Sequence, residues 1–176
     1  MVTNEKKINP ERPTWEESFM FAAYSAAARS SCKYIHTGAV IIKDKRIISM
    51  GYNGAPPGIK SCSDIGCRKD RLNIKWEEKG HGNCRGVHAE ANAMHQISRE
   101  NLKGTVLYTV YYPCSHCARA IVANGISEVV YSKIYKEPDS LTKELFSEAG
   151  IKLTRLPIDT KKHCNRILDV GNQPTL

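Results

Sequence analysis

Two short stretches of the 176-residue chain decide its fold, His88-Ala89-Glu90 and Pro113-Cys114-Ser115-His116-Cys117. Together they offer one imidazole beside a carboxylate, and two thiols three residues apart. Three protein ligands leave the fourth tetrahedral position of a zinc ion open for water, which is characteristic of catalytic rather than structural zinc sites. We therefore predict a catalytic zinc centre. Its expected ligands are His88, Cys114 and Cys117.

The spacing within each stretch indicates how the roles are divided. On a helix, Cys114 and Cys117 share one face, and the macrodipole of the first turn favours their thiolate forms. Glu90 is two residues after His88, so its carboxylate points away from the metal. A zinc ion lowers the pKa of water to about 7. We expect Glu90 to carry protons to the substrate and the leaving group, and His116 to face away from the metal.

Hydrophobic periodicity and turn residues predict the elements around these stretches. Thr14 and Glu17 have the spacing of a capping box at the start of a helix. The expected helices cover residues 15–30, 88–96, 113–123 and 141–149, and the expected strands cover 38–43, 46–51, 105–111, 127–131 and 151–156. This order predicts an α/β fold of three layers, α/β/α, with one mixed central sheet.

Composition and charge limit the class of protein, its cellular compartment and its partners. The chain is 41% hydrophobic and 25% charged, as in an ordinary globular domain, and it contains no apolar run of about 18 residues that could span a membrane. Its polar N-terminus does not resemble a secretory signal, so we expect a cytoplasmic protein without a membrane partner. Seven cysteines in such a protein indicate thiolate ligands rather than disulfides, and the formal net charge of +8 favours an anionic partner.

Four cysteines outside the first centre form a second candidate metal site. They are Cys32, Cys62, Cys67 and Cys84. Four thiolates complete a closed structural zinc site, and a metal would hold a long polar loop that has little apolar content. His81 is the alternative ligand to Cys32, whereas Cys164 is interpreted as a lone thiol. The competing interpretation is a set of buried free cysteines or redox-labile thiols.

The two motifs, the order of elements and the turn Gly51-Tyr52-Asn53-Gly54-Ala55-Pro56 after the predicted hairpin resemble deoxycytidylate (dCMP) deaminases. The likeness is greatest to the bacterial and phage type that includes the late competence deaminase, and it covers about residues 15–156. The pattern H-x-E…P-C-x-x-C alone indicates only the wider cytidine deaminase-like superfamily. The resemblance divides the chain into an N-terminal arm (1–13), a zinc-dependent deaminase domain (14–156) with a cysteine-bearing insertion (59–87), and a C-terminal tail (157–176).

The resemblance implies deamination of dCMP to dUMP with release of ammonia. It implies that Asn53 contacts the nucleotide, that the backbone of residues 55–58 lies close to a phosphate, and that a second zinc ion lies beside the insertion. Ala89 and Tyr112 are further expected substrate contacts. Tyr112 directly precedes Pro113, and Tyr111 is the alternative to it for packing on the sugar or base. A homohexamer, activation by dCTP and inhibition by dTTP are also implied.

Three other functions compete with this interpretation. A tRNA adenosine deaminase shares the zinc motif and suits the basic charge, but the Gly-Tyr-Asn-Gly turn and the cysteine-rich insertion fit it poorly, so no stable nucleic-acid partner is expected. Deaminases of nucleosides, free bases or a pterin precursor share the same chemistry. A zinc-stabilised binding module without turnover would have no use for Glu90.

Overall fold

The computed structural model describes residues 12–75, 78, 81–135 and 138–171. A five-stranded sheet of order β2-β1-β3-β4-β5 forms its centre. Its strands are β1 (Gly38–Lys43), β2 (Arg46–Tyr52), β3 (Val106–Tyr111), β4 (Glu128–Lys133) and β5 (Lys152–Arg155). β1 runs antiparallel to β2 and β3, whereas β3, β4 and β5 are mutually parallel. The predicted single mixed sheet is therefore confirmed.

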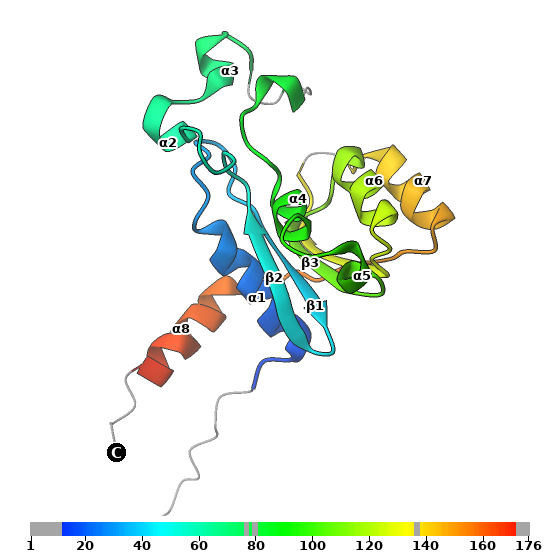
Figure 1. Cartoon of the computed structure of the whole chain (residues 1–176). Coiled ribbons are helices and arrows are strands. Elements are labelled where there is room, and N and C mark those ends of the chain that lie inside the picture. The colour runs from blue at the N-terminus through cyan, green and yellow to red at the C-terminus, as the bar shows by residue number, and fades with distance from the viewer. Residues whose placement is uncertain (1–11, 76–77, 79–80, 136–137, 172–176) are drawn as a thin grey trace, which may run out of the picture.

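Helices cover both faces of this sheet (Figure 1). One face carries α1 (Trp15–Ala27) and α8 (Thr160–Gly171). The other carries α4 (Ala89–Met94), α5 (Arg99–Leu102), α6 (Ser115–Ala123) and α7 (Ser140–Glu148). Successive residues of β1 alternate between the faces. Ala39 and Ile41 pack with the second group of helices, and Val40 and Ile42 pack with α1. The predicted three-layer α/β/α fold is confirmed.

Local chemistry explains the first helix and the hairpin. The Thr14 hydroxyl accepts a hydrogen bond from the Glu17 backbone N–H at 3.1 Å, and the Thr14 backbone N–H donates to the Glu17 carboxylate at 2.8 Å, which completes the predicted capping box. Asp44 and Lys45 both have positive φ, as the tight turn between β1 and β2 requires.

Helix boundaries differ from the sequence expectations at several ends. α1 ends at Ala27 rather than near Ser30, and α4 ends at Met94 rather than Gln96. Periodicity predicts no helix or strand in residues 157–176, but α8 occupies 160–171 of them. This helix packs on α1 through His163, whose ring stacks on Phe21 with centroids 5.4 Å apart. No helix of the described residues is both long and apolar enough to cross a membrane.

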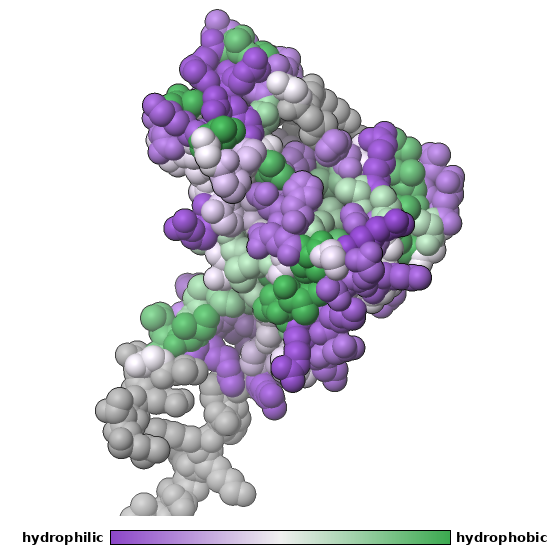
Figure 2. Space-filling model, viewed as in Figure 1, coloured by the Kyte–Doolittle hydropathy of each residue, from purple (hydrophilic) through white to green (hydrophobic). Residues whose placement is uncertain are grey.

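The insertion projects beyond the sheet at the top of Figure 1. It contains three short helices, α2 (Cys62–Ile65), α3 (Arg68–Arg71) and the 3-10 helix η1 (His81–Asn83). Neither α2 nor α3 has a buried residue, and Figure 2 shows a mostly hydrophilic surface there. Apolar burial therefore contributes little to the placement of this segment.

Gly51 allows α4 to lie directly on β2. A Cβ atom at this position would lie 2.4 Å from the Ala93 nitrogen and 2.5 Å from the Ala89 oxygen. Two hydrogen bonds hold the contact, from the Ser49 hydroxyl to the Ala93 oxygen at 2.7 Å and from the Asn92 amide to the Tyr52 oxygen at 2.7 Å. The position of α4 is thus fixed by backbone contact with the sheet.

We expect Gly51→Ala to destabilise the fold by about 1–3 kcal/mol or more, since the added methyl group would push α4 away from β2. Urea unfolding measures the effect, and zinc analysis should show weaker metal retention because His88 directly precedes α4. Gly171→Ala is the matched control, as its Cβ would meet open space. Equal unfolding midpoints for Gly51→Ala and the parent would contradict this account.

Candidate metal centre and active site

The site lies at one edge of the sheet. β1 begins at this edge and β2 ends there, because Gly38 pairs with Tyr52. The parallel strands β3 and β4 end at the same edge, where Tyr111 pairs with Lys133. Both α4 and α6 begin close to it, so their N-termini meet beyond the strand ends. In open α/β sheets, ligands bind outside the carboxyl ends of the strands.

The three predicted zinc ligands come together at this edge. The Nδ1 atom of His88 lies 3.5 Å from the Cys114 sulfur and 3.4 Å from the Cys117 sulfur. Zinc bonds of about 2.3 Å to sulfur and about 2.0–2.1 Å to nitrogen, at tetrahedral angles, place such donors roughly 3.5 Å apart. The donor set therefore fits a zinc ion. Within the described ranges, it is the only group of three or more candidate ligands at such spacing.

Two of the ligands are N-cap residues with extended backbones. His88 has φ −69° and ψ 153° before α4, and Cys114 has φ −75° and ψ 163° before α6. The expectation that Cys114 lies inside the first helical turn is wrong by one residue, because α6 begins at Ser115 and the extended Cys114 is its N-cap. Cys117 is in the first turn, so both sulfurs remain near the positive end of the helix dipole.

The two thiols shift each other's pKa in opposite directions. A hydrogen bond from the Cys117 thiol, reinforced by His88, lowers the pKa of Cys114 to about 3. The same hydrogen bond, together with burial, raises the pKa of Cys117. The lowered pKa of Cys114 favours its thiolate, which is the form that binds a metal.

Glu90 is a buried acid beside the metal ligands. Its side chain is 5% exposed, and burial raises the pKa of its carboxyl group, while His88 opposes the rise. The carboxylate is not a member of the ligand group. A buried carboxyl group with a raised pKa suits a residue that takes up and releases a proton during a reaction.

A cavity of about 260 Å³ opens over these residues. Its walls bring together distant segments of the chain: the loop before β1, the turn after β2, the end of the insertion and the segments after β3 and β4. The lining residues include His88, Glu90, Cys114, Asn53, Ala55, Val87, Ile35, Thr37, Tyr111, Tyr112 and Tyr135. The wall is mainly apolar and aromatic, as is typical of small-molecule sites.

The expected substrate contacts occupy different positions in this cavity. Asn53 lines it, and its amide braces the loop before β1 by donating to the Ile35 oxygen and accepting from the Thr37 N–H, both at 2.9 Å. Tyr112 also lines it and packs edge-on against Tyr131. Ala89 is fully buried and does not line the cavity, so the structure does not place it as a substrate contact.

Three cysteines of the second candidate site share the cavity wall. Cys32, Cys62 and Cys84 line it, whereas Cys67 does not. Burial raises the pKa of Cys62 most, followed by the influence of Cys32, Cys67 and Cys84. Among the described residues, the four thiols do not form a group whose ligand atoms all lie within 4.8 Å of one another. The side chain of His81, the alternative ligand, lies outside the described part of the structure. Cys164 is an exposed free thiol on α8.

Residues at the start of α7 hold the chain on either side of Cys114 in place. Spacing along the chain does not predict this link. The Asp139 carboxylate accepts hydrogen bonds from the backbone N–H of Ser115 at 3.1 Å and of Leu141 at 3.2 Å. The Thr142 hydroxyl donates to the Pro113 oxygen at 3.1 Å. Asp139 directly precedes a predicted helix, so its role as an N-cap could be predicted from the sequence. Its contact with α6 could not be predicted in this way.

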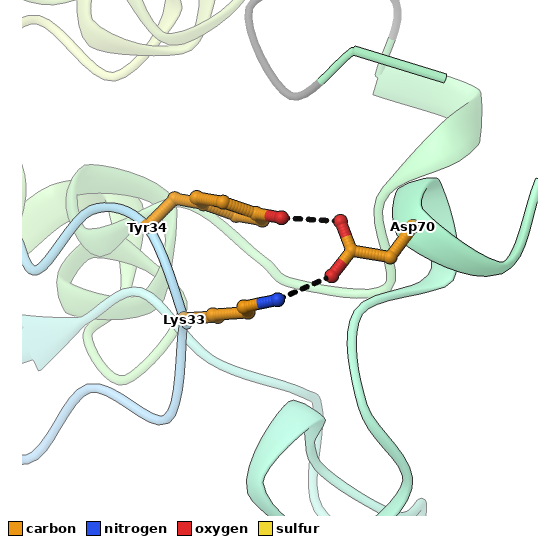
Figure 3. Close-up of polar contacts among 3 residues, drawn as sticks. All are labelled: Lys33, Tyr34 and Asp70. Atoms are coloured by element: carbon orange, nitrogen blue, oxygen red, sulfur yellow. Dashed lines mark hydrogen bonds and ion pairs between the residues drawn. The ribbon is translucent and has the colours of Figure 1, made fainter. Parts of the chain in front are cut away.

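A polar cluster joins the insertion to the loop before β1 (Figure 3). Asp70 of α3 pairs with Lys33 at 2.9 Å and accepts a hydrogen bond from the Tyr34 hydroxyl. The hydrogen bond from Tyr34, followed by that from Lys33, lowers the pKa of Asp70. Because the Lys33–Asp70 ion pair is solvent-exposed, it contributes little to the free energy of unfolding. Its main effect is to orient the insertion beside the cavity.

Comparison with known proteins agrees with this geometry. Residues 13–133 match the family model described as the cytidine and deoxycytidylate deaminase zinc-binding region. The chain belongs to this family. It is therefore a zinc-dependent deaminase, a hydrolase that acts on C–N bonds, and its His-Cys-Cys group is the zinc site.

Several individual proteins are similar to the chain over most of its length. The deoxycytidylate deaminase of Mycobacterium phage D29 is 43% identical over 124 residues, which cover 69% of this chain and 97% of the relative. ComE operon protein 2 of Bacillus subtilis (strain 168) is 35% identical over 169 residues, covering 94% and 81%. The structure of dCMP deaminase from cyanophage S-TIM5 in complex with dCMP and dUMP has a TM-score of 0.67 at 25% identity, covering 83% and 99%. The predicted resemblance is confirmed.

Removing one ligand should empty the zinc site. We expect Cys117→Ala to lose one zinc ion per chain and all deaminase activity, because two protein ligands retain the metal poorly. Metal analysis of the purified protein together with an ammonia-release assay measures both losses. Cys164→Ala is the control and should lose neither. Full zinc content in Cys117→Ala would show that the ligand assignment is wrong.

Proposed function

We propose that the protein converts dCMP and water to dUMP and ammonia, and so supplies dUMP for dTMP synthesis. The observation that carries the proposal is the His-Cys-Cys group and the buried Glu90 in one cavity, within a chain that matches deoxycytidylate deaminases over most of its length. A solved relative that holds dCMP and dUMP supports the same substrate class.

The residues of the site suit each step of this reaction. A zinc ion held by the three ligands would supply a water of lowered pKa as the nucleophile. The Glu90 carboxylate would take one proton from the attacking water and deliver it to the pyrimidine ring nitrogen. It would then take the remaining proton of the added hydroxyl and pass it to the departing amine, which leaves as ammonia while the carbonyl of the product forms. The aromatic wall, including Tyr111 and Tyr112, would hold the base and exclude bulk water. We propose Asn53 and Tyr112 as further substrate contacts.

Family membership is also the basis for proposing an oligomeric state and its regulation by nucleotides. We propose a homohexamer that dCTP activates and dTTP inhibits, with the cytoplasmic location expected from the sequence. The edge strand β2 offers one surface for subunit contact, since Ile47, Ile48 and Met50 are exposed hydrophobic residues. Figure 2 shows hydrophobic surface at the level of the β1–β2 hairpin.

The substrate and the role of Glu90 can be tested together. Ammonia release is measured with dCMP, CMP, deoxycytidine, cytosine, guanine and tRNA. The parent protein should act on dCMP, and Glu90→Gln should lower the rate by about 10²–10⁴-fold or more while retaining zinc, since it removes the proton carrier. Reaction with tRNA or a free base instead of dCMP would replace the proposed substrate, whereas an active Glu90→Gln variant would refute the proton transfer.

We further propose that Cys32, Cys62, Cys67 and Cys84 hold a second, structural zinc ion. The interaction of Cys62 with the other three thiols and the lack of buried residues in α2 and α3 support it. The parent should bind two zinc ions per chain and Cys62→Ser one, with a lower unfolding midpoint. Cys164→Ser should keep both ions. A parent with a single zinc ion would favour free or redox-labile cysteines.

A further inference from the structure

Two buried threonine hydroxyls, those of Thr37 and Thr109, have no hydrogen-bond partner among the residues that the structure describes. A buried hydroxyl without a partner destabilises a fold, because it has given up its hydrogen bonds with water and gained none in return. Thr109 is fully buried in β3 and does not line the cavity, whereas Thr37 is a residue of the cavity wall. Of the two hydroxyls, that of Thr37 is therefore the one within reach of a ligand.

The backbone of Thr37 is held on both sides by Asn53. The Thr37 N–H donates to the side-chain oxygen of Asn53 at 2.9 Å, and the Thr37 oxygen accepts from the Asn53 backbone N–H at 3.1 Å. These bonds extend the antiparallel pairing of β1 with β2 by one residue, since Gly38 pairs with Tyr52. The turn after β2 thus fixes the position of Thr37 and leaves its hydroxyl unused.

This pairing also determines the face of the sheet on which the Thr37 side chain lies. Successive side chains of a strand point to opposite faces. A Cβ atom on Gly38 would lie 2.1 Å from the Ala23 oxygen of α1, so position 38 faces α1. Ala39 packs on the opposite face with Ala89 of α4 (Figure 1). Thr37 therefore shares with Ala39 the face that carries α4, α6 and the metal ligands.

The residues already assigned to the reaction leave a place for this hydroxyl. Glu90 and the metal ligands act at the amine-bearing end of the pyrimidine. The side-chain oxygen and nitrogen of Asn53 both bond to the backbone of the loop before β1. A threonine hydroxyl can donate one hydrogen bond. The nucleoside part of dCMP has to enter the cavity, and it offers two acceptors, the pyrimidine carbonyl oxygen and the 3′-hydroxyl oxygen of the deoxyribose.

We propose that the Thr37 hydroxyl donates a hydrogen bond to one of these two oxygens and thereby holds the nucleoside part of the substrate in the cavity. The inference rests on the proposed deamination of dCMP and adds a residue that binds its nucleoside. The hydroxyl destabilises the free protein and gains its partner when the substrate binds.

Thr37→Val removes the hydroxyl and keeps the shape of the side chain. It should lower kcat/KM for dCMP by about 5- to 100-fold, mainly through KM, because a buried substrate oxygen loses its donor. The variant should keep its zinc, and its midpoint of urea unfolding should equal or exceed that of the parent, because an unpartnered buried hydroxyl is replaced by a methyl group. Thr37→Ser keeps the donor and should recover most of the loss.

Thr109→Val is the matched control. It removes a hydroxyl that is likewise buried and without a partner among the described residues, but that lies outside the cavity wall. Its kcat/KM for dCMP should match that of the parent. An equal loss in both valine variants would overturn the inference, because the effect would then come from the loss of any buried hydroxyl.

Calorimetric binding of dUMP and two analogues identifies the oxygen that Thr37 contacts. The factor by which Thr37→Val weakens the binding of dUMP should disappear with 2-thio-dUMP, whose sulfur is a weaker acceptor, if the contact is to the pyrimidine carbonyl. It should disappear with the 2′,3′-dideoxy analogue if the contact is to the sugar. A factor that persists with both analogues would overturn the inference.

Three further results would overturn it. They are an unchanged kcat/KM for dCMP in Thr37→Val, a loss of zinc, and a lower unfolding midpoint, the last two of which would show that the hydroxyl supports the fold. If the parent does not deaminate dCMP, the proposed function fails and the binding of dUMP decides the inference. Equal affinity of the parent and Thr37→Val would then overturn it, and failure of the parent to bind dUMP would overturn both.

Discussion

The meeting of two helix N-termini at one edge of the sheet is the constraint on which the site depends. His88 and Cys114 are both N-cap residues, so each projects from the positive end of a helix toward the same point. α4 reaches this point because Gly51 lets it lie on β2, and α6 is held by Asp139 and Thr142 of the neighbouring α7. The active site is therefore sensitive to packing between helix and sheet.

The insertion shows a different way of placing a wall of the site. With no buried residues in α2 or α3, it depends on polar contacts. Asp70 ties it to Lys33 and Tyr34, and the Ser63 hydroxyl donates to the Ser31 oxygen at 3.5 Å. Since Ser31 lines the cavity, this wall of the site is held by polar contacts rather than by apolar burial.

Burial sets the chemistry of the acid in this site. Glu90 is 5% exposed, and burial raises the pKa of its carboxyl group while His88 opposes the rise. The described residues that line the cavity include no Lys or Arg, so the basic residues behind the net charge of +8 lie elsewhere.

Residue type, short spacing and local periodicity were enough to predict the ligand trio, the acid, the capping box and the mixed sheet. They did not predict α8, whose packing depends on contact between His163 and Phe21. Nor did they identify Ile35, Thr37 and Tyr135 in the wall, or connect Asp139 to α6. These features arise from contacts between segments far apart in the chain, which short spacing and periodicity do not encode, so they become visible in the folded structure alone.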